Sequence, residues 1–437
     1  MRIMVDLSAT LIHHGHIRLL KKASSIGEVV VGLTSDKEIL KKKGYIPELT
    51  FSQRKEILKS VAFVSEVVSV PWLINENILN KHDCDLLVHG DDNSNNLPKS
   101  KVKVFKRTKG ISSTGLRKKS AEILFSRKSF LRRMLTPGPG AVPFESVELI
   151  GPAFGRGDKE FQKIYDNSIQ WLKKQSGQDK VIPLQGSATL SIELGLHTFV
   201  YGSVLIIADG VYGKRLQELL PQGIKMTVIT SAELTDVIQS RKSFDWIVTP
   251  YTETSIGYKH DIKDLKHAKD LLNAKLFLDA TASIGLERDH KVADVCCFSS
   301  CKGLFGITGA SFITHKSNLK IRKSNLFYFN YETHLNKLIT GPYHQLCSIY
   351  GVSKVHFHLV QSVKNSKNGI SEIFTPYAKP LRNQPLLCTH IKESVIGREN
   401  VVLYQPRQSV EGSIICHLGD IYRSSKYDAG IAIDRNA

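Results

Sequence analysis

The sequence predicts two α/β units of unequal size, one over residues 1–130 and one over residues 131–437. In the first 130 residues, short apolar runs alternate with helical patterns, which is typical of a parallel sheet covered by helices. The turn-rich segment 136–140 interrupts this alternation, and the same pattern then restarts on a larger scale. A length of 437 residues also favours two or three globular units.

In the first unit we expect strands over residues 2–5, 29–33, 66–70 and 86–88, and helices over residues 16–23 and 52–61. Ser52 is the expected N-cap of the second helix, because it precedes the run QRKEILKSV. The basic stretch 116–133 is helical in composition, and we place the domain boundary inside it, near residue 130.

In the second unit we expect strands over residues 204–208, 225–229, 246–249 and 276–279. Helical patterns over residues 213–220 and 262–272 lie between them. This part of the chain is therefore also predicted to be α/β.

The net charge of +19 and the hydrophobic fraction of 41% limit which classes of protein and of binding partner are possible. Enough apolar material is present for sizeable cores, which excludes wholesale disorder. A basic surplus suits either nucleic acid or small anionic substrates. The excess is spread over both units and forms no dedicated arm, so the charge alone leaves the choice between these partners open. From the motifs that follow we expect small anionic molecules and no nucleic acid as partners.

The N-terminus and the cysteines indicate the compartment. The apolar stretch 1–7 is broken by Asp6 and is too short for a signal sequence, and no run approaches the ~20 apolar residues of a membrane span. The seven cysteines are odd in number, and the clustered Cys296, Cys297 and Cys301 lack a second Cys/His pair at zinc spacing. We expect reduced thiols, no protein-held metal and a cytoplasmic location.

The first motif is the segment His13-His14-Gly15-His16, which follows the first predicted strand and opens a helix. Parallel α/β sheets bind ligands at the carboxyl ends of their strands, where helix N-termini present free N–H groups to phosphate. Gly15 permits close backbone approach, and His13 and His16 can each donate to a phosphate oxygen that gains charge in the transition state. In isolation, ordinary polar turn residues would explain the segment equally well.

A second motif, Arg107-Thr-Lys-Gly-Ile-Ser-Ser-Thr114, lies about 90 residues further on at another strand-to-helix transition. The two motifs, in this order and spacing, resemble the HxGH cytidylyltransferase family, whose second signature reads RTEGISTT. The segments 31–36 and 89–92 and Arg54 also match that family. The resemblance covers residues 1 to about 120 and is greatest for the subgroup that accompanies phosphonate biosynthesis; it implies a Rossmann-like nucleotidyltransferase domain.

The resemblance implies roles for individual residues. His13 and His16 would be catalytic, stabilising the triphosphate while an oxygen nucleophile attacks the α-phosphorus and pyrophosphate leaves. The nucleotide-binding set would be Gly15, Lys42, Asp91, Arg107, Lys109, Ser112, Ser113 and Thr114. Any lysine of the run 41–43 fits the pattern within one residue, and a solvated lysine face is the alternative for that run.

Two positions depart from the family pattern. Lys109 replaces the acidic residue of RTEGIS, which adds charge without removing a group that the mechanism needs. Asn93 stands where relatives have Trp, so CTP rather than ATP is implied by the resemblance alone. Mg²⁺ is the metal expected with the triphosphate.

The second unit carries an acid and a lysine at strand ends, Asp279 and Lys302. Such a pair suits pyridoxal 5′-phosphate (PLP), because the carboxylate keeps the ring nitrogen protonated and the lysine binds the cofactor covalently. The segment 185–189, QGSAT, precedes a helical run and can hold a phosphate with backbone N–H groups and hydroxyls.

The order of these and further segments resembles class V aminotransferases, and 2-aminoethylphosphonate–pyruvate transaminases in particular. The matching segments are LTPGP (135–139), RGDKEF (156–161), GVYGKR (210–215) and ETSIG (253–257). The resemblance runs from about residue 134 to the C-terminus, with a poor match over the last 100 residues, and implies a PLP-dependent fold type I aminotransferase-like domain.

By this resemblance Lys302 is the catalytic lysine that carries the cofactor, Asp279 contacts its ring nitrogen, and Ser187, Ala188 and Thr189 bind its phosphate. The segment 340–344 stands where relatives contribute a phosphate contact from the partner subunit of a homodimer, with Tyr343 in place of the usual Thr. His417 stands where relatives have an arginine that grips the amino donor's carboxylate.

Together the two resemblances predict a bifunctional enzyme of aminophosphonate metabolism. The second unit would aminate phosphonoacetaldehyde with an amino donor, and the first would join the resulting 2-aminoethylphosphonate to CMP and release pyrophosphate. One alternative is a phosphorylated alcohol such as glycerol 3-phosphate as acceptor, with an unrelated PLP enzyme as the second unit. Another is that the second unit is a catalytically silent dimerisation module.

Overall fold

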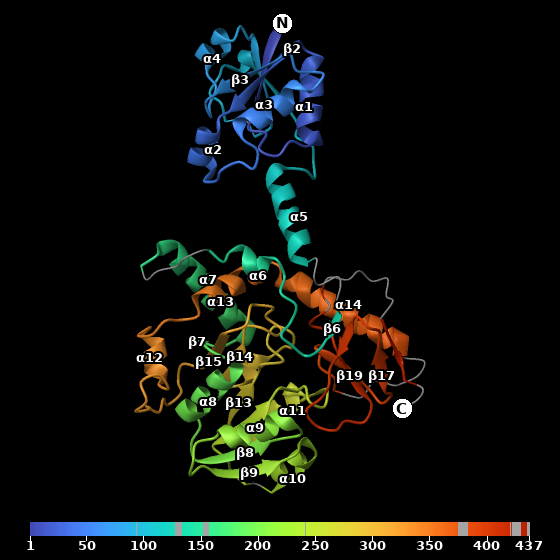
Figure 1. Cartoon of the computed structure of the whole chain (residues 1–437). Coiled ribbons are helices and arrows are strands. Elements are labelled where there is room, and N and C mark those ends of the chain that lie inside the picture. The colour runs from blue at the N-terminus through green and yellow to red at the C-terminus, as the bar shows by residue number, and fades with distance from the viewer. Residues whose placement is uncertain are drawn as a thin grey trace. The chain divides into compact units, whose positions relative to one another are not determined.

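The computed structural model describes residues 1–92, 94–126, 133–151, 157–240, 242–374, 383–419, 421 and 430–434. The chain divides into two compact units, Met1–Phe125 and Ser126–Ala437, and Figure 1 labels many of their elements. We expected this division near residue 130, and residues 127–132 lie outside the described ones. Both units combine helices with sheets, so the predicted α/β class is confirmed.

The first unit contains a five-stranded parallel sheet in the order β3-β2-β1-β4-β5. Its strands are β1 (Arg2–Leu7), β2 (Glu28–Thr34), β3 (Glu66–Val70), β4 (Leu86–Gly90) and β5 (Val102–Phe105). Its α-helices are α1 (His14–Ser24), α2 (Asp36–Lys43), α3 (Phe51–Lys59), α4 (Glu76–Lys81) and α5 (Ser113–Ser126). All four predicted strands and both helices are therefore present.

The alternation of side chains along β1 builds two cores. Ile3 and Val5 pack with Leu20 of α1 and Leu58 of α3, and Met4 packs on the opposite face with Leu79 of α4. Because β2 and β4 lie on either side of β1, the strand order reverses at β1. Ligands of open α/β sheets bind outside the carboxyl ends of the strands at such a point.

Two local expectations in and after this unit are wrong. Thr50, not Ser52, is the N-cap of α3, and it forms a reciprocal capping box with Gln53. The helix expected over 116–133 corresponds to α5, which begins at Ser113 and is described as far as Ser126. Arg133, the last residue of the expected helix, belongs to a strand of the second unit.

The second unit is built on a seven-stranded sheet in the order β7-β15-β14-β13-β10-β8-β9. Its strands are β7 (Lys180–Gln185), β8 (Ser203–Ile207), β9 (Lys225–Ile229), β10 (Trp246–Pro250), β13 (Lys275–Asp279), β14 (Val295–Ser299) and β15 (Ala310–His315). Only β15 runs antiparallel to its neighbours. The carboxyl ends of β7, β8, β10, β13 and β14 therefore meet at one edge.

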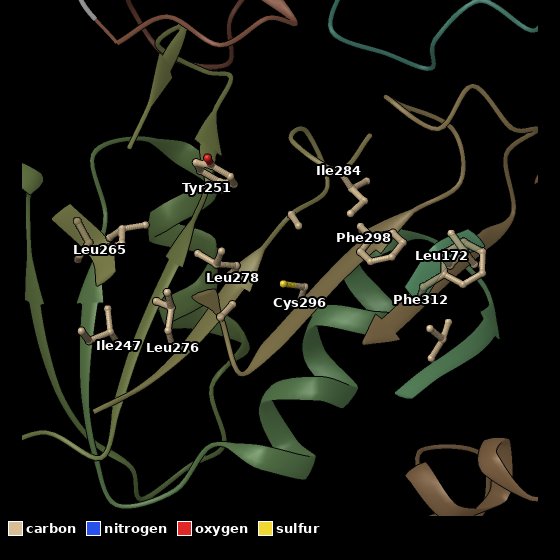
Figure 2. Close-up of a cluster of buried hydrophobic side chains, with 14 of the residues drawn as sticks. Leu172, Ile247, Tyr251, Leu265, Leu276, Leu278, Ile284, Cys296, Phe298 and Phe312 are labelled. Carbon is tan, nitrogen blue, oxygen red and sulfur yellow. The ribbon is translucent and has the colours of Figure 1, made fainter. Parts of the chain in front are cut away.

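Helices cover both faces of this sheet. One core packs Leu172 of α7 (Lys159–Ser176), Leu265 of α11 (Ile262–Leu271) and Leu346 of α13 (Tyr343–Ser353) against inward side chains such as Leu276 and Phe298, part of which Figure 2 shows. The opposite core contains side chains from α8 (Ala188–Phe199) and α9 (Val211–Leu219). A sheet buried on both faces needs continuous apolar strands, which is why VLII and LFL were recognisable in the sequence.

A smaller layer of short strands packs on α14 (His356–Phe374). It contains β6 (Arg133–Leu135), β16 (Cys388–Ile391), β17 (Val395–Gly397), β18 (Val401–Leu403), β19 (Ser413–Cys416) and β20 (Ile431–Ile433). Further short elements are α6 (Glu145–Glu148), α10 (Leu234–Gln239), α12 (Tyr331–Leu335), β11 (Thr252–Glu253) and β12 (Tyr258–Lys259). Across the described residues, no helix is both long and apolar enough to cross a membrane.

Candidate functional sites

The turn between β1 and α1 fixes His13 and His16 through the backbone. His13 is the N-cap of α1, and its Nδ1 accepts a hydrogen bond from Gly15 N at 3.2 Å. His16 Nδ1 accepts from His13 N, also at 3.2 Å. Since both Nδ1 atoms are acceptors, each neutral ring carries its proton on Nε2. The two imidazoles stack with centroids 3.9 Å apart.

Both histidines are neutral near pH 7. Burial and nearby positive charge, including that of Arg107, lower the pKa of His13. Burial is also the main cause that lowers the pKa of His16 to about 4, with His13, Arg107 and Lys43 adding to it. The pair therefore offers Nε2–H hydrogen-bond donors, and the positive charge of the site comes from other residues.

The second motif forms the facing wall. Gly110 adopts a φ of 79° and turns the chain into α5, and Ser113 Oγ donates to the backbone oxygen of Leu11 at 2.9 Å. A Cβ on Gly15 would lie only 3.2 Å from Ile111 Cγ2. Glycine at position 15 therefore allows the two motifs to approach each other closely.

The two walls enclose a cavity of about 230 Å³. Of the predicted nucleotide site, it is lined by His13, Gly15, His16, Arg107, Ser112, Ser113 and Thr114. Three predicted residues are not in the lining: Lys42, Asp91 and Lys109. Lys43 and Asp92 line the cavity in place of their neighbours, because successive residues of a helix or turn point in different directions.

Acidic and imidazole side chains form another part of the lining. His89 Nε2 lies 3.6 Å from Asp6 Oδ2, and His89 Nδ1 lies 3.7 Å from Asp92 Oδ1. Asp6 is buried, which raises its pKa, although Asn95 Nδ2 donates to it at 3.1 Å. Sequence reasoning missed Asp6 as a site residue; its signal was an acidic residue interrupting an apolar strand.

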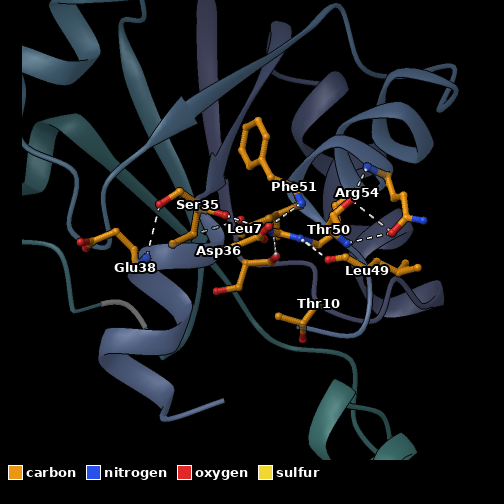
Figure 3. Close-up of polar contacts among 12 residues, drawn as sticks. Leu7, Thr10, Ser35, Asp36, Glu38, Leu49, Thr50, Phe51 and Arg54 are labelled. Atoms are coloured by element: carbon orange, nitrogen blue, oxygen red, sulfur yellow. Dashed lines mark hydrogen bonds and ion pairs between the residues drawn. The ribbon is translucent and has the colours of Figure 1, made fainter. Parts of the chain in front are cut away.

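Arg54 holds the loops around this cavity together and is completely buried. Its guanidinium donates to Ser8 O at 2.5 Å, Thr34 O at 3.0 Å and Leu49 O at 3.1 Å, and it pairs with Asp36 at 2.5 Å. Figure 3 shows Arg54 with Leu49 and Asp36. One side chain thus links the ends of β1 and β2 to the loop before α3.

In the second unit, Asp279 and Lys302 lie at the carboxyl edge of the large sheet. Asp279 ends β13, where its Oδ1 accepts from Thr281 N at 2.9 Å, and its Oδ2 lies 4.0 Å from Arg215 Nη2. Lys302 follows β14, and its Nζ lies 5.7 Å from the ring centre of Tyr212. A Cβ on Gly138 would lie 3.1 Å from Lys302 Cγ, so the glycine leaves room for the lysine.

Tyr212 and Arg215 are held by the start of α9. The buried carboxylate of Glu253 accepts from Gly213 N at 2.9 Å and from Ser255 Oγ at 2.5 Å, and Ser255 Oγ accepts from Val211 N at 3.1 Å. Burial raises the pKa of Glu253, and these hydrogen bonds oppose that rise. The sequence marked these segments as motifs but did not predict that they contact each other.

The expected phosphate-binding segment opens α8. Ser187 is the N-cap of this 12-residue helix and makes no side-chain capping bond there, and Ala188 and Thr189 form its first turn. The N–H groups of such a first turn are free of intrahelical partners. Segment 185–189 therefore has the geometry of an anion cradle at the same sheet edge as Asp279 and Lys302.

The residues around Lys302 fit PLP. Among the described residues, the buried atoms Thr281 Oγ1, Thr254 Oγ1 and Arg215 Nε have no hydrogen-bond partner. Unsatisfied buried polar atoms are costly unless a ligand completes them. They accompany a carboxylate, a lysine and a helix N-terminus, which are the donor and acceptor types that PLP requires.

Two positions in the poorly matching region depart from the family pattern, and both side chains pack against other residues of the unit. His417 is completely buried and contacts Ser366 Oγ at 3.3 Å and Thr389 Oγ1 at 2.9 Å, so its side chain belongs to the core beneath α14. Burial lowers its pKa well below the usual range. Tyr343 packs on Phe161 with ring centroids 4.8 Å apart. The predicted residues Asn93 and Arg156 lie outside the described residues.

Comparisons with known proteins agree with this division. Residues 9–119 match the family described as cytidylyltransferase-like. An ethanolamine-phosphate cytidylyltransferase of Arabidopsis thaliana is 32% identical over 168 residues, which are 33% of this chain and 39% of that protein. A 2-aminoethylphosphonate–pyruvate transaminase of Pseudomonas aeruginosa is 25% identical over 201 residues, 42% of this chain and 54% of that one. The chain thus spans less than two thirds of either relative.

Solved structures show the fold of the second unit. The ureidoglycine–glyoxylate aminotransferase of Bacillus subtilis superposes with a TM-score of 0.57 at 17% identity, covering 67% of this chain and 89% of that one. A pyridoxamine–pyruvate aminotransferase of Mesorhizobium loti gives the same TM-score at 15% identity, covering 66% and 86%. The chain therefore joins a cytidylyltransferase-like Rossmann-type unit to a unit with the fold of PLP-dependent aminotransferases.

Proposed function

We propose that this protein is a bifunctional enzyme of aminophosphonate metabolism. Its first unit transfers the cytidylyl group of CTP to 2-aminoethylphosphonate and releases pyrophosphate. Its second unit uses PLP to aminate phosphonoacetaldehyde, which yields that acceptor. The observation that carries the proposal is the presence, in one chain, of a stacked His13–His16 pair in a basic cavity and an Asp279–Lys302 pair at a second sheet edge.

The geometry of the first cavity suits nucleotidyl transfer. An oxygen of the acceptor attacks the α-phosphorus of CTP, and the bond to pyrophosphate breaks. His13 and His16 donate through Nε2–H to phosphate oxygens that gain charge, and their fixed orientation avoids reorganisation during the reaction. Arg107 and Lys43 supply positive charge, and the start of α5 presents N–H groups to phosphate. Mg²⁺ would accompany the triphosphate as part of the substrate.

In the second unit, Lys302 would bind PLP, Asp279 would hold its ring nitrogen, and Ser187, Ala188 and Thr189 would hold its phosphate. When bound, this cofactor supplies an electron sink for the carbon that carries the amino group. Arg215 orients the carboxylate of Asp279 at 4.0 Å. The amine of Lys302 would also move the proton at the reacting carbon.

Two relatives support an aminoethyl phosphorus compound as the shared substrate. One is named for ethanolamine phosphate and the other for 2-aminoethylphosphonate. In ethanolamine phosphate an oxygen joins the ethyl group to phosphorus, whereas in 2-aminoethylphosphonate the carbon is bonded to phosphorus directly. If the product of the second unit is the acceptor for the first, the two units of one chain catalyse consecutive steps. Ethanolamine phosphate is the second candidate acceptor, favoured by the relative of the first unit.

The surface beside the phosphate cradle supports a homodimer. Segment 321–338 exposes six large apolar side chains: Ile321, Leu326, Phe327, Tyr328, Leu335 and Leu338. Tyr328 Oη donates to Gln185 O at 3.2 Å, which ties this surface to the segment before Ser187. Thr340 and Tyr343 line a small cavity together with Gln185. We propose that a second copy covers this surface and completes the cofactor site.

The cysteines support a reducing location. All seven are free thiols. Reduced thiols persist in the cytosol and are uncommon in secreted proteins. We therefore propose that the protein works in the cytoplasm.

Two measurements test the proposal. The purified chain, incubated with PLP, should gain visible absorption from the lysine-bound cofactor, and Lys302→Ala should abolish it. Pyrophosphate release should require CTP together with an aminoethyl acceptor. A colourless protein after PLP addition would contradict the transaminase assignment and favour a silent second unit. Pyrophosphate release that is independent of an acceptor would contradict the transferase assignment.

A further inference from the structure

Two cysteines face each other across the hairpin of β16 and β19. Cys388 pairs in register with Cys416 in this antiparallel ladder. His417 N donates to Leu387 O at 2.9 Å, which makes the flanking positions the hydrogen-bonded pair. Hydrogen-bonded and non-hydrogen-bonded pairs alternate, so Cys388 and Cys416 form a non-hydrogen-bonded pair with Cα atoms ~4.5 Å apart. That separation lies within the range that a disulfide bridges.

The two cysteine side chains share one buried environment. Both side chains are fully buried in one apolar cluster with Ala282, Phe305 and Leu418. One segment links this pair to the region of Lys302: Ala141 N donates to Leu418 O at 2.7 Å, and Gly140 N donates to Cys301 O at 2.7 Å. The pair therefore lies near the proposed cofactor lysine and needs no change of strand register to form a bond.

The remaining cysteines are placed differently. Cys296 and Cys297 are consecutive on β14, and their side chains enter opposite cores. Cys347 belongs to the core beneath α13, and Cys84 lies in the first unit. Cys301 is partly exposed, with Sγ 3.7 Å from Ser299 Oγ. The described structure thus singles out one facing pair.

We propose that Cys388 and Cys416 form a dithiol modification site that peroxide converts into a cross-strand disulfide. One sulfur attacks a peroxide oxygen, the O–O bond breaks, and a sulfenic acid and one water form. The second sulfur then attacks the sulfenic sulfur and displaces a second water. The two thiols together lose two electrons and two protons, and hydrogen peroxide is reduced to two waters.

Burial governs the rate of this reaction. The pKa of Cys416 lies well above its usual range, because burial and the neighbouring Cys388 thiol disfavour the thiolate. Since the thiolate is the nucleophile, oxidation is slow at neutral pH and accelerates as the pH rises. A thiol in an apolar cluster is also protected from oxidation beyond the disulfide, because a second peroxide has restricted access.

The first experiment maps the bond in the full-length chain and does not depend on any activity. Reduced protein is treated with hydrogen peroxide at pH 8, unfolded in denaturant and alkylated with N-ethylmaleimide, and then digested and examined by mass spectrometry. We expect two of the seven thiols to escape alkylation, one linked peptide pair joining Cys388 to Cys416, and reversal by dithiothreitol. Alkylation of both cysteines after peroxide treatment, or linkage of either to another cysteine, would overturn the proposal.

Matched variants identify the pair. Cys388→Ala should remove the linked peptides and leave Cys416 open to alkylation. Cys347→Ala removes a buried thiol from the core that contains Leu172 and Leu265, and it should leave the linked peptides intact. The peptide map of the wild-type protein needs no variant, so the test remains decisive even if a variant fails to fold.

A second arm connects the bond to the cofactor site and rests on the proposed function. Oxidation should change the visible absorption of the lysine-bound cofactor, since the bond fixes the chain near Lys302. Pyrophosphate release should stay unchanged, because Cys84 is the one cysteine among residues 1–125. If reduced protein with PLP shows no visible band, the transaminase assignment is wrong, but the mapped Cys388–Cys416 linkage is unaffected. A normal band without the linkage contradicts the dithiol site.

Discussion

His13 and His16 stack with ring centroids 3.9 Å apart, and each Nδ1 accepts a backbone N–H at the start of α1. This capping arrangement serves the helix and the site together. It satisfies orphan N–H groups of α1 and directs the protonated Nε2 atoms away from the backbone. A motif of two histidines around a glycine is therefore a way to hold two neutral donors in one orientation.

The first prediction concerns the donating atom of His16. His16→Gln places an amide N–H near the position of Nε2, and His16→Asn places it near Nδ1. We expect His16→Asn to lower the kcat of pyrophosphate release about 10²–10³-fold, as the loss of an oriented donor does, and His16→Gln to lower it less. Steady-state kinetics with CTP measures both. Equal losses would show that donation from Nε2 is not the role of this residue.

The second prediction distinguishes two adjacent lysines. Lys43 lines the cavity and Lys42 does not. Lys43→Ala should therefore lower kcat/KM for CTP about tenfold or more, through the loss of one charge near the phosphates. Lys42→Ala is the matched control and should stay within twofold of wild type. A larger loss of kcat/KM in Lys42→Ala than in Lys43→Ala would show that Lys42 is the lysine that contacts the nucleotide.

The third prediction concerns Arg54, which is buried and makes four hydrogen-bonded contacts. Arg54→Met leaves three carbonyl oxygens and Asp36 without their partner, and should destabilise the first unit by about 3–5 kcal/mol. Hydrogen exchange read by mass spectrometry should show lost protection in residues 1–125 and unchanged protection from residue 133 onward. The exposed neighbour substitution Lys59→Met should change neither region.

The fourth prediction is a pH dependence of stability. His290 is buried with Nε2 2.8 Å from Ser283 Oγ, and burial lowers its pKa to about 4. The unfolded histidine titrates near 6.5, so the unfolded state binds more protons between pH 6.5 and 4. Stability should therefore fall as the pH drops through this window, by roughly 3 kcal/mol from this residue.

Urea unfolding between pH 7 and pH 4.5 measures this contribution. His290→Gln keeps a polar group near Ser283 but does not titrate, so its stability should depend less on pH. His260, whose pKa burial also lowers to about 4, contributes in the same direction and remains in the variant. An identical pH dependence in variant and wild type would rule out His290 as a source.

The sequence predicts those parts of the fold that depend on local signals. Apolar runs such as those of β2 and β13 identify buried parallel strands, and the glycines of the motifs identify turns at their ends. The two candidate sites follow, because carboxyl ends of parallel strands converge. This is why the sequence alone predicts His13, His16, Asp279 and Lys302 as candidate site residues.

Features that depend on side-chain direction were not predictable. Whether Lys42 or Lys43 faces a cavity depends on a rotation of about 100° per residue of helix α2. The same limit applies at the end of β19, where Cys416 joins the apolar cluster of Phe305 and the following residue, His417, contacts Thr389. The contacts of Asp6 with His89 and of Glu253 with α9 join segments far apart in the sequence, and no local pattern encodes them.

The identity of the acceptor can be tested by comparing reaction rates for four candidate molecules. The kcat/KM of CTP-dependent pyrophosphate release is compared for 2-aminoethylphosphonate, ethanolamine phosphate, glycerol 3-phosphate and phosphocholine. We predict the highest value for 2-aminoethylphosphonate and a value at least tenfold lower for glycerol 3-phosphate, a difference of about 1.4 kcal/mol in transition-state binding. Release that is no faster with the phosphonate than with the phosphate esters would show that 2-aminoethylphosphonate is not the preferred acceptor.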